Sequence, residues 1–238
     1  MNESKAYILR HNAPLSIEYS EMCSSTCDKV GLEWEYFEGF TNMSRKAAWC
    51  QTGIKMKFEE KPKFIENQTR AQKIGCTDAG HAAIWKKIAD SDKNGIVLEH
   101  DALMYFNPSN ITKFRIPNNF IIVLGYKTDT PDNYNYVEAN KQEPRLHYLE
   151  GHQGAHAYMM TPKTARYLVD EIEELGILGD VDNSYFIRGP RSTKIPLLIM
   201  SPTPALGYVR KSTTNDDPNK ISTFNLDFIP EFDKYFKK

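Results

Sequence analysis

The first 40 residues alternate between strand-like and helix-like patterns, and this alternation restricts the chain to a small set of folds. An apolar run at residues 6–10 predicts a strand, and residues 32–37 predict a second one. Between them, Ser16 is placed to cap a helix that continues to about Val30, where Gly31 ends it. A strand, a crossover helix and a second strand form the unit that builds parallel sheets. We therefore expect an α/β fold with a mostly parallel central sheet flanked by helices.

The rest of the chain continues this alternation. A helical pattern begins at Thr77, and Thr161-Pro162 predicts the start of another helix that ends at Gly176. Residues 41–66 and 126–145 are predicted to be long loops, the first with a short helix near Arg45–Trp49. Apolar runs predict further strands at residues 96–98, 120–125, 147–149, 154–161 and 195–200.

The composition argues against several classes of protein. The formal net charge is −1, and lysines alternate with acids along the chain, unlike the clustered basic surface of a nucleic-acid-binding protein. No apolar run approaches the roughly 18 residues of a membrane span, and no basic start precedes an apolar segment. We therefore expect a cytoplasmic protein without an integral membrane segment. The 4 cysteines do not suggest a disulfide framework.

Acidic residues follow directly after the predicted strand at residues 96–98. The sequence there continues with Glu99-His100-Asp101. Ligands of open α/β sheets bind beyond the carboxyl ends of strands. Glu99 and Asp101 alternate at strand spacing, so both carboxylates can point the same way and hold a hard divalent cation that neutralises a diphosphate. A solvated surface turn is the alternative interpretation of this short motif.

The residues upstream of this strand make the pattern more specific. Gly75-Cys76, His81, the helix-borne Trp85 and the strand that ends in Glu99-His100-Asp101 resemble glycosyltransferase family 25, which includes bacterial lipooligosaccharide galactosyltransferases and collagen galactosyltransferases. The segment Gly154–Thr161 resembles a second block of the same family. The resemblance extends over roughly residues 5–190. It implies a nucleotide-diphospho-sugar transferase fold of the GT-A type, in a catalytic domain at residues 1–205 followed by an extension at residues 206–238.

Two positions depart from the family pattern. The Ser-His of the family is Gly80-His81 here, and the middle acid of its Glu-Asp-Asp is His100. The resemblance implies that the third acid, Asp101, binds the metal and that the middle position contacts the ribose. His100 can hydrogen-bond a ribose hydroxyl, act as a nitrogen ligand, or mark a degenerate site.

The resemblance implies an enzyme that transfers a hexose, galactose among the candidates, from a UDP-sugar to a glycan or another hydroxylated acceptor. Mn²⁺ or Mg²⁺ is the expected cofactor, held by Asp101 and Glu99. The expected donor-binding residues are Arg10, His11, Gly75, His81, Glu99, His100 and Tyr158. The residues themselves leave other roles open, because Arg10 and His11 can belong to an exposed loop, and His81 and Tyr158 can serve packing.

The family implies inversion at the anomeric carbon, which needs a carboxylate to take the proton of the acceptor hydroxyl. Asp182 is our first candidate for this base and Asp180 the second, with helix capping as the alternative role.

Two further functions are kept open. The first is a catalytically degenerate relative that binds a sugar or a nucleotide. The second is a metalloenzyme unrelated to sugar transfer, because five of the 6 histidines lie in the central region, namely His81, His100, His147, His152 and His156.

Overall fold

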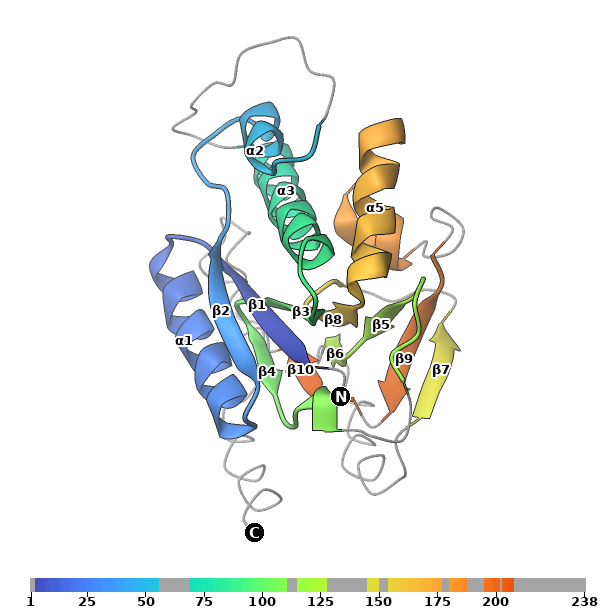
Figure 1. Cartoon of the computed structure of the whole chain (residues 1–238). Coiled ribbons are helices and arrows are strands. Elements are labelled where there is room, and N and C mark those ends of the chain that lie inside the picture. The colour runs from blue at the N-terminus through green and yellow to red at the C-terminus, as the bar shows by residue number, and fades with distance from the viewer. Residues whose placement is uncertain are drawn as a thin grey trace.

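The computed structural model describes residues 3–55, 69–110, 115–127, 145–149, 154–176, 180–187, 195–201 and 203–207. A seven-stranded sheet runs through the centre of the molecule (Figure 1). In spatial order its strands are β2 (Glu33–Glu38), β1 (Ser4–Arg10), β3 (Asn94–Glu99), β8 (Ala157–Met160), β5 (Ile121–Val123), β9 (Leu197–Ser201) and β7 (Arg145–Leu149).

Most strands of this sheet run in one direction. β1 is parallel to β2 and β3, and β5 is parallel to β9, whereas β8 and β7 are antiparallel to their neighbours. Five of the seven described strands (β2, β1, β3, β5 and β9) therefore point the same way. The predicted α/β class with a mostly parallel sheet is confirmed. The strand β8 was predicted, but its reversed direction was not.

Helices cover both faces of the sheet (Figure 1). On β1, Ala6 and Ile8 pack in one apolar cluster with Cys23 of helix α1 (Pro14–Lys29). The alternate residues Tyr7 and Leu9 pack in the other cluster with helices α3 (Arg70–Ala89) and α5 (Pro162–Leu175). Side chains alternate along a strand, so these clusters lie on opposite faces of the sheet. A short helix α2 (Arg45–Gln51), predicted from the sequence, packs on α3.

Two helices begin earlier than predicted. Helix α1 starts at Pro14, and the Ser16 hydroxyl accepts a hydrogen bond from the main-chain nitrogen of His11 instead of capping the helix. Helix α3 starts at Arg70, where Thr69 and Gln72 form a reciprocal capping box. Gly75 and Thr77 have weak helix propensity and hid this first part of α3 from the sequence pattern.

A second, three-stranded sheet was not predicted. It consists of β4 (Ala102–Met104), β10 (Ala205–Gly207) and β6 (Gly125–Lys127) in the order β4-β10-β6. The predicted domain boundary at residue 205 falls on β10. The loops predicted at 41–66 and 126–145 lie partly outside the described residues, as does the extension at 206–238. Two short helical turns complete the described elements, η1 (Pro108–Asn110) and η3 (Asp182–Ile187).

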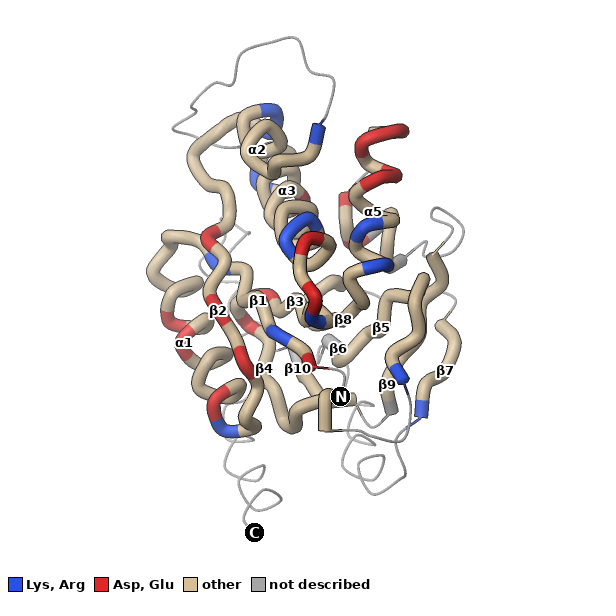
Figure 2. Tube along the Cα trace, viewed as in Figure 1, with Lys and Arg blue, Asp and Glu red and all other residues tan. Residues whose placement is uncertain are grey.

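Strand β2, the edge strand of the described sheet, carries charged residues (Figure 2). Lys5 pairs with Glu35 at 2.8 Å, Lys93 pairs with Glu33 at 2.6 Å, and Lys87 also pairs with Glu35. Charges on an edge strand disfavour pairing with another chain, so this edge is protected against aggregation. In the described part of the chain, every helix is too short or too polar to cross a bilayer.

Candidate active site

The carboxyl ends of β1 and β3 lie side by side. Leu9 is paired with Glu99, so Arg10 and His11 follow β1 next to the point where β3 ends. The reversed strand β8 begins at the same place: the main-chain nitrogen of Glu99 donates a hydrogen bond to the main-chain oxygen of His156, the residue before β8, at 2.8 Å. Several predicted site residues therefore gather at one edge of the sheet, the edge at which open α/β sheets bind ligands.

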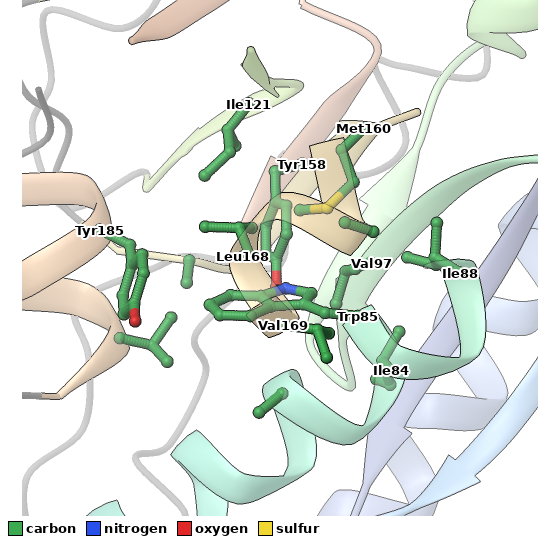
Figure 3. Packing of buried hydrophobic residues seen from close by; sticks show 14 of the residues in the cluster. Ile84, Trp85, Ile88, Val97, Ile121, Tyr158, Met160, Leu168, Val169 and Tyr185 are labelled. Atoms are coloured by element: carbon green, nitrogen blue, oxygen red, sulfur yellow. The ribbon is translucent and has the colours of Figure 1, made fainter. Parts of the chain in front are cut away.

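A chain of buried hydrogen bonds leads to this edge. The indole nitrogen of Trp85 points at the Tyr158 hydroxyl (Figure 3) and donates to it at 2.7 Å. The same hydroxyl lies 2.8 Å from Nδ1 of His81. Nε2 of His81 lies 3.4 Å from Oε1 of Glu99. Because Tyr158 accepts from Trp85, its own proton is available for Nδ1. His81 then carries its proton on Nε2 and donates it to Glu99.

This network keeps Glu99 ionised. Burial of the Glu99 carboxyl raises its pKa, but the hydrogen bond from His81 and the electrostatic interactions with His81, His100 and His156 outweigh burial and hold the pKa at about 2. A negative charge is therefore fixed at the end of β3 at neutral pH.

His100 is held against helix α1. Its ring stacks on that of Tyr19, with centroids 6.1 Å apart and planes at 4°. The His11 ring lies edge-on to it, with centroids also 6.1 Å apart. Burial lowers the pKa of His11, and it lowers the pKa of His100 to about 4. Both imidazoles are therefore neutral at pH 7 and can offer a hydrogen-bond donor and an acceptor to a ligand.

Asp101 lies in the turn that follows β3, which ends at Glu99. Burial and the neighbouring Cys27 raise the pKa of the Cys23 thiol in α1, and the charge of Asp101 raises it further. Glu99 contacts His81 of α3. That the carboxylates of Glu99 and Asp101 hold one cation stays a prediction.

The donor atoms at this edge are compatible with a divalent cation in chemical type. Carboxylate oxygens are the preferred ligands of Mg²⁺ and Mn²⁺, and Asp101 supplies them next to the fixed charge of Glu99. Within the described ranges, no three His, Cys, Asp or Glu side chains are arranged to hold one ion. A cation bound here would therefore take its remaining ligands from outside those ranges, from water or from substrate.

The turn η3 brings the candidate bases to the same network. Tyr185 packs edge-on against Trp85 with ring centroids 5.0 Å apart, and Phe186 packs on Tyr158 at 4.9 Å. Burial raises the pKa of Tyr158, the Trp85 hydrogen bond opposes this rise, and the charges of Glu99 and Asp182 add to it. Asp182 itself is exposed at the start of η3, and Asp180 is half-buried.

Two predicted donor-binding residues, Gly75 and Arg10, make structural contacts, and their role at the donor stays a prediction. Gly75 lies inside α3, where an added Cβ would come within 2.5 Å of Cγ of Arg45, so this glycine allows α2 to pack closely. Arg10 forms an ion pair with Glu38, and its guanidinium lies 3.7 Å from the centre of the Tyr36 ring. Neither residue belongs to the His81 network.

The five histidines of the central region do not all lie together in the described structure. His147 is exposed on β7 at the far edge of the sheet, and His152 lies outside the described residues. The group that forms around Glu99 instead consists of His81, His100 and His156, with His11 beside them.

Sequence reasoning missed the hydrogen bond of Asp78 to the main chain and that of Trp85 to Tyr158. Asp78 is 4% exposed, and its Oδ1 accepts a hydrogen bond from the main-chain nitrogen of Val181 at 2.9 Å. A signal was present, because Asp78, His81 and Trp85 follow one another at spacings of three and four residues and so share one face of α3.

Comparisons with known proteins bear on the identity of this site. The family model described as glycosyltransferase family 25 (LPS biosynthesis protein) matches residues 15–184, which include every residue of the His81 network and both candidate bases. The sequence matches none of the curated proteins.

Similar solved structures include an active-site mutant of LgtC, at 8% identity and a TM-score of 0.46 over 97% of this chain and 95% of that one. The galactosyltransferase LgtC in complex with donor and acceptor sugar analogs is similar at 11% identity and a TM-score of 0.45, over 98% and 96% of the two chains. A glycosyltransferase involved in glycosylation of the major capsid of PBCV-1 has 10% identity and a TM-score of 0.32, over 71% and 68%. Because these identities and TM-scores are low, we base the assignment to a family on the family-model match alone.

Proposed function

The chain belongs to glycosyltransferase family 25, and on this basis we propose that it transfers a hexose from a UDP-sugar to a hydroxyl group of a glycan or another acceptor, with inversion and with the help of a divalent cation. Galactose is one of the hexoses that the family implies. The α/β sheet flanked by helices is compatible with the GT-A type of fold expected for such a transferase.

One observation carries this proposal: Glu99 and the segment that holds Asp182, from two distant parts of the chain, both belong to the surroundings of His81 and Tyr158. Glu99 at the end of β3 lies 3.4 Å from His81, and η3, which begins at Asp182, packs on Tyr158 through Phe186 with ring centroids 4.9 Å apart. Inverting transfer by a single displacement needs carboxylates in two places, one to hold the cation that neutralises the leaving diphosphate and one to take the proton of the acceptor hydroxyl. We assign the end of β3 to the first role and η3 to the second.

Each residue then has a role at the donor or at the acceptor. Asp101 would hold Mn²⁺ or Mg²⁺, with Glu99 nearby as a fixed negative charge. Such an ion, when bound, supplies positive charge that neutralises the leaving diphosphate. His81 and Tyr158 keep Glu99 ionised and oriented. His11 and His100 present neutral imidazoles as hydrogen-bonding partners for the ribose or diphosphate of the donor.

The acceptor side needs a general base. Asp182 is exposed at the start of η3, the turn that packs on Tyr158 through Phe186, and can reach an acceptor that arrives from solvent. The base takes the proton of the acceptor hydroxyl while the oxygen attacks the anomeric carbon on the face opposite the diphosphate. Asp180 is the second candidate for this base.

The test is a panel of UDP-hexoses assayed for UDP release and for transfer to sugar acceptors, with Mn²⁺, with Mg²⁺ and with a chelator. We expect release by the wild type that depends on the cation, and its loss in Asp101→Ala. The matched control is Asp170→Asn, because Asp170 is exposed on α5, away from the β3 edge. Turnover that is unchanged in Asp101→Ala would refute the assignment of the metal ligand.

The same assay decides between an enzyme and a binding protein. The presence of His100 in place of the family acid favours a degenerate relative as the second candidate. Calorimetric binding of UDP with Mn²⁺, without UDP release from any donor of the panel, would support that candidate.

A further inference from the structure

The carboxylate of Asp78 joins α3 to the segment that carries the candidate bases. Its Oδ1 accepts a hydrogen bond from the main-chain nitrogen of Val181 at 2.9 Å, across 103 positions of sequence. Asp180 and Asp182 are the immediate neighbours of Val181 on either side. Asp78 shares its helix face with His81, so one face of α3 contacts both the β3 carboxylate and the η3 segment.

The hydrogen bond between Asp78 and Val181 restricts the orientation of the main chain more strictly than the aromatic packing of η3 does. Tyr185 and Phe186 pack against Trp85 and Tyr158 through aromatic contacts, which tolerate small shifts and rotations. A hydrogen bond weakens steeply when its angle departs from linearity. The Asp78 carboxylate therefore sets the orientation of the main chain at Val181, and with it the positions from which Asp180 and Asp182 project.

The bond does not require a charge on Asp78. The groups that face its carboxylate are His81 on the same helix, Arg45 of α2, Asp180 and the Val181 nitrogen. Either protonation state of the carboxyl has an oxygen that can accept from Val181, and so does the amide oxygen of an asparagine. Asp78→Asn therefore keeps the acceptor, whereas Asp78→Ala removes it.

We propose that Asp78 is a positioning residue for the acceptor side of the reaction: it holds the Val181 main chain so that Asp182 or Asp180 reaches the acceptor hydroxyl. The proposal rests on the transferase function proposed above, and it adds a residue that acts through the base without touching substrate. It predicts a defect in the chemical step, since the donor is bound by other residues.

Steady-state kinetics of the full chain test this role with the donor and acceptor that the panel identifies. We expect Asp78→Ala to lower kcat by up to about 100-fold, because a small displacement of a catalytic group is costly, and to leave KM for the donor unchanged. We expect Asp78→Asn to restore most of kcat. Hydrogen exchange of the Val181 amide should be faster in Asp78→Ala and slow again in Asp78→Asn.

A matched control separates positioning from a general loss of stability. Thr164 in α5 is fully buried and its hydroxyl also accepts a hydrogen bond from a main-chain nitrogen, that of Asn119, at 2.9 Å. Thr164→Val removes that bond in a region that the site does not use. We expect Thr164→Val to lower the free energy of unfolding while keeping kcat and the exchange rate of the Val181 amide.

Two results would overturn the proposal while leaving the transferase function intact. One is wild-type kcat in Asp78→Ala despite faster exchange at Val181, which would mean that the position of this segment does not matter for the reaction. The other is a loss of kcat in Thr164→Val as large as that in Asp78→Ala. If the wild type itself transfers no hexose from any donor, the transferase function fails and the role of Asp78 fails with it.

Discussion

The indole nitrogen of Trp85 donates a hydrogen bond to the hydroxyl of Tyr158 across 2.7 Å, and both side chains are fully buried. This contact between α3 and β8 determines how the neighbouring polar groups share their protons. The hydroxyl is left with its own proton for His81, and His81 donates in turn to Glu99. Apolar packing and a fixed carboxylate at the sheet edge are thus parts of one arrangement.

Removal of this hydroxyl tests the network. Tyr158→Phe leaves the Trp85 nitrogen and Nδ1 of His81 without their shared partner in a buried environment. We expect the free energy of unfolding to fall by about 1–3 kcal/mol, measured by urea denaturation. Tyr148→Phe is the control, because Tyr148 is 76% exposed, and we expect a change within about 0.5 kcal/mol. Equal effects of the two substitutions would contradict the network.

Glu99 should make the stability depend on acidity. Its pKa in the folded protein is about 2, below the ordinary value of 4.5, so the stabilisation is present above about pH 4.5 and is lost as the pH falls towards about 2. One pKa unit corresponds to about 1.4 kcal/mol, which limits this contribution to about 3 kcal/mol. Glu99→Gln removes the titrating group.

We therefore expect Glu99→Gln to be less stable than the wild type at neutral pH and to approach the wild type as the pH is lowered, in urea titrations at a series of pH values. A difference between the two proteins that stays constant across this pH range would show that Glu99 does not titrate with a lowered pKa.

The secondary structure was predictable where local signals are strong. Thr161 caps α5, Pro162 opens it and Gly176 ends it with a positive φ of 78°, and all three were recognised in the sequence. The sheet β4-β10-β6 was not, because its strands have three residues each and pair across the chain, as Ala205 does with Met104. Such pairing leaves no local signal in the sequence.

The site was predictable in its residues more than in its contacts. The family resemblance selected His81, Glu99 and Tyr158, which the structure brings together. The sequence could not show that Trp85 binds the Tyr158 hydroxyl, since 73 positions separate them and an aromatic residue on a helix face usually serves packing.

Gly80 stands where the family has a serine, and its neighbourhood gives the reason. An added Cβ would lie 2.9 Å from Cδ1 of Leu9, so a side chain at position 80 collides with a fully packed leucine of β1. We expect Gly80→Ser to lower the free energy of unfolding by about 1–3 kcal/mol, even though serine favours a helix more than glycine does. Thermal or urea denaturation measures this change.

A smaller residue at position 9 should relieve the collision. Leu9→Ala alone creates a cavity and costs about 2–5 kcal/mol. In the double variant the serine occupies part of that space, so the loss should be smaller than the sum of the two single losses. Strict additivity in this double-mutant cycle would rule out the steric explanation.

Asp78 should make the free energy of unfolding depend on pH in the opposite sense to Glu99. Burial raises its pKa from 3.8 to about 7, while the Val181 hydrogen bond and His81 oppose that rise. Between these two pKa values the folded protein binds more protons than the unfolded one, so stability falls as the pH rises from about 4 to about 7. Asp78→Asn cannot ionise and escapes this loss.

At about 1.4 kcal/mol per pKa unit, the free energy of unfolding of Asp78→Asn should rise relative to that of the wild type by at most about 4 kcal/mol as the pH increases. Urea titrations across this range check the expectation. Thr164→Val, whose difference from the wild type should not vary with pH, is the control, and a constant difference for Asp78→Asn would contradict the raised pKa.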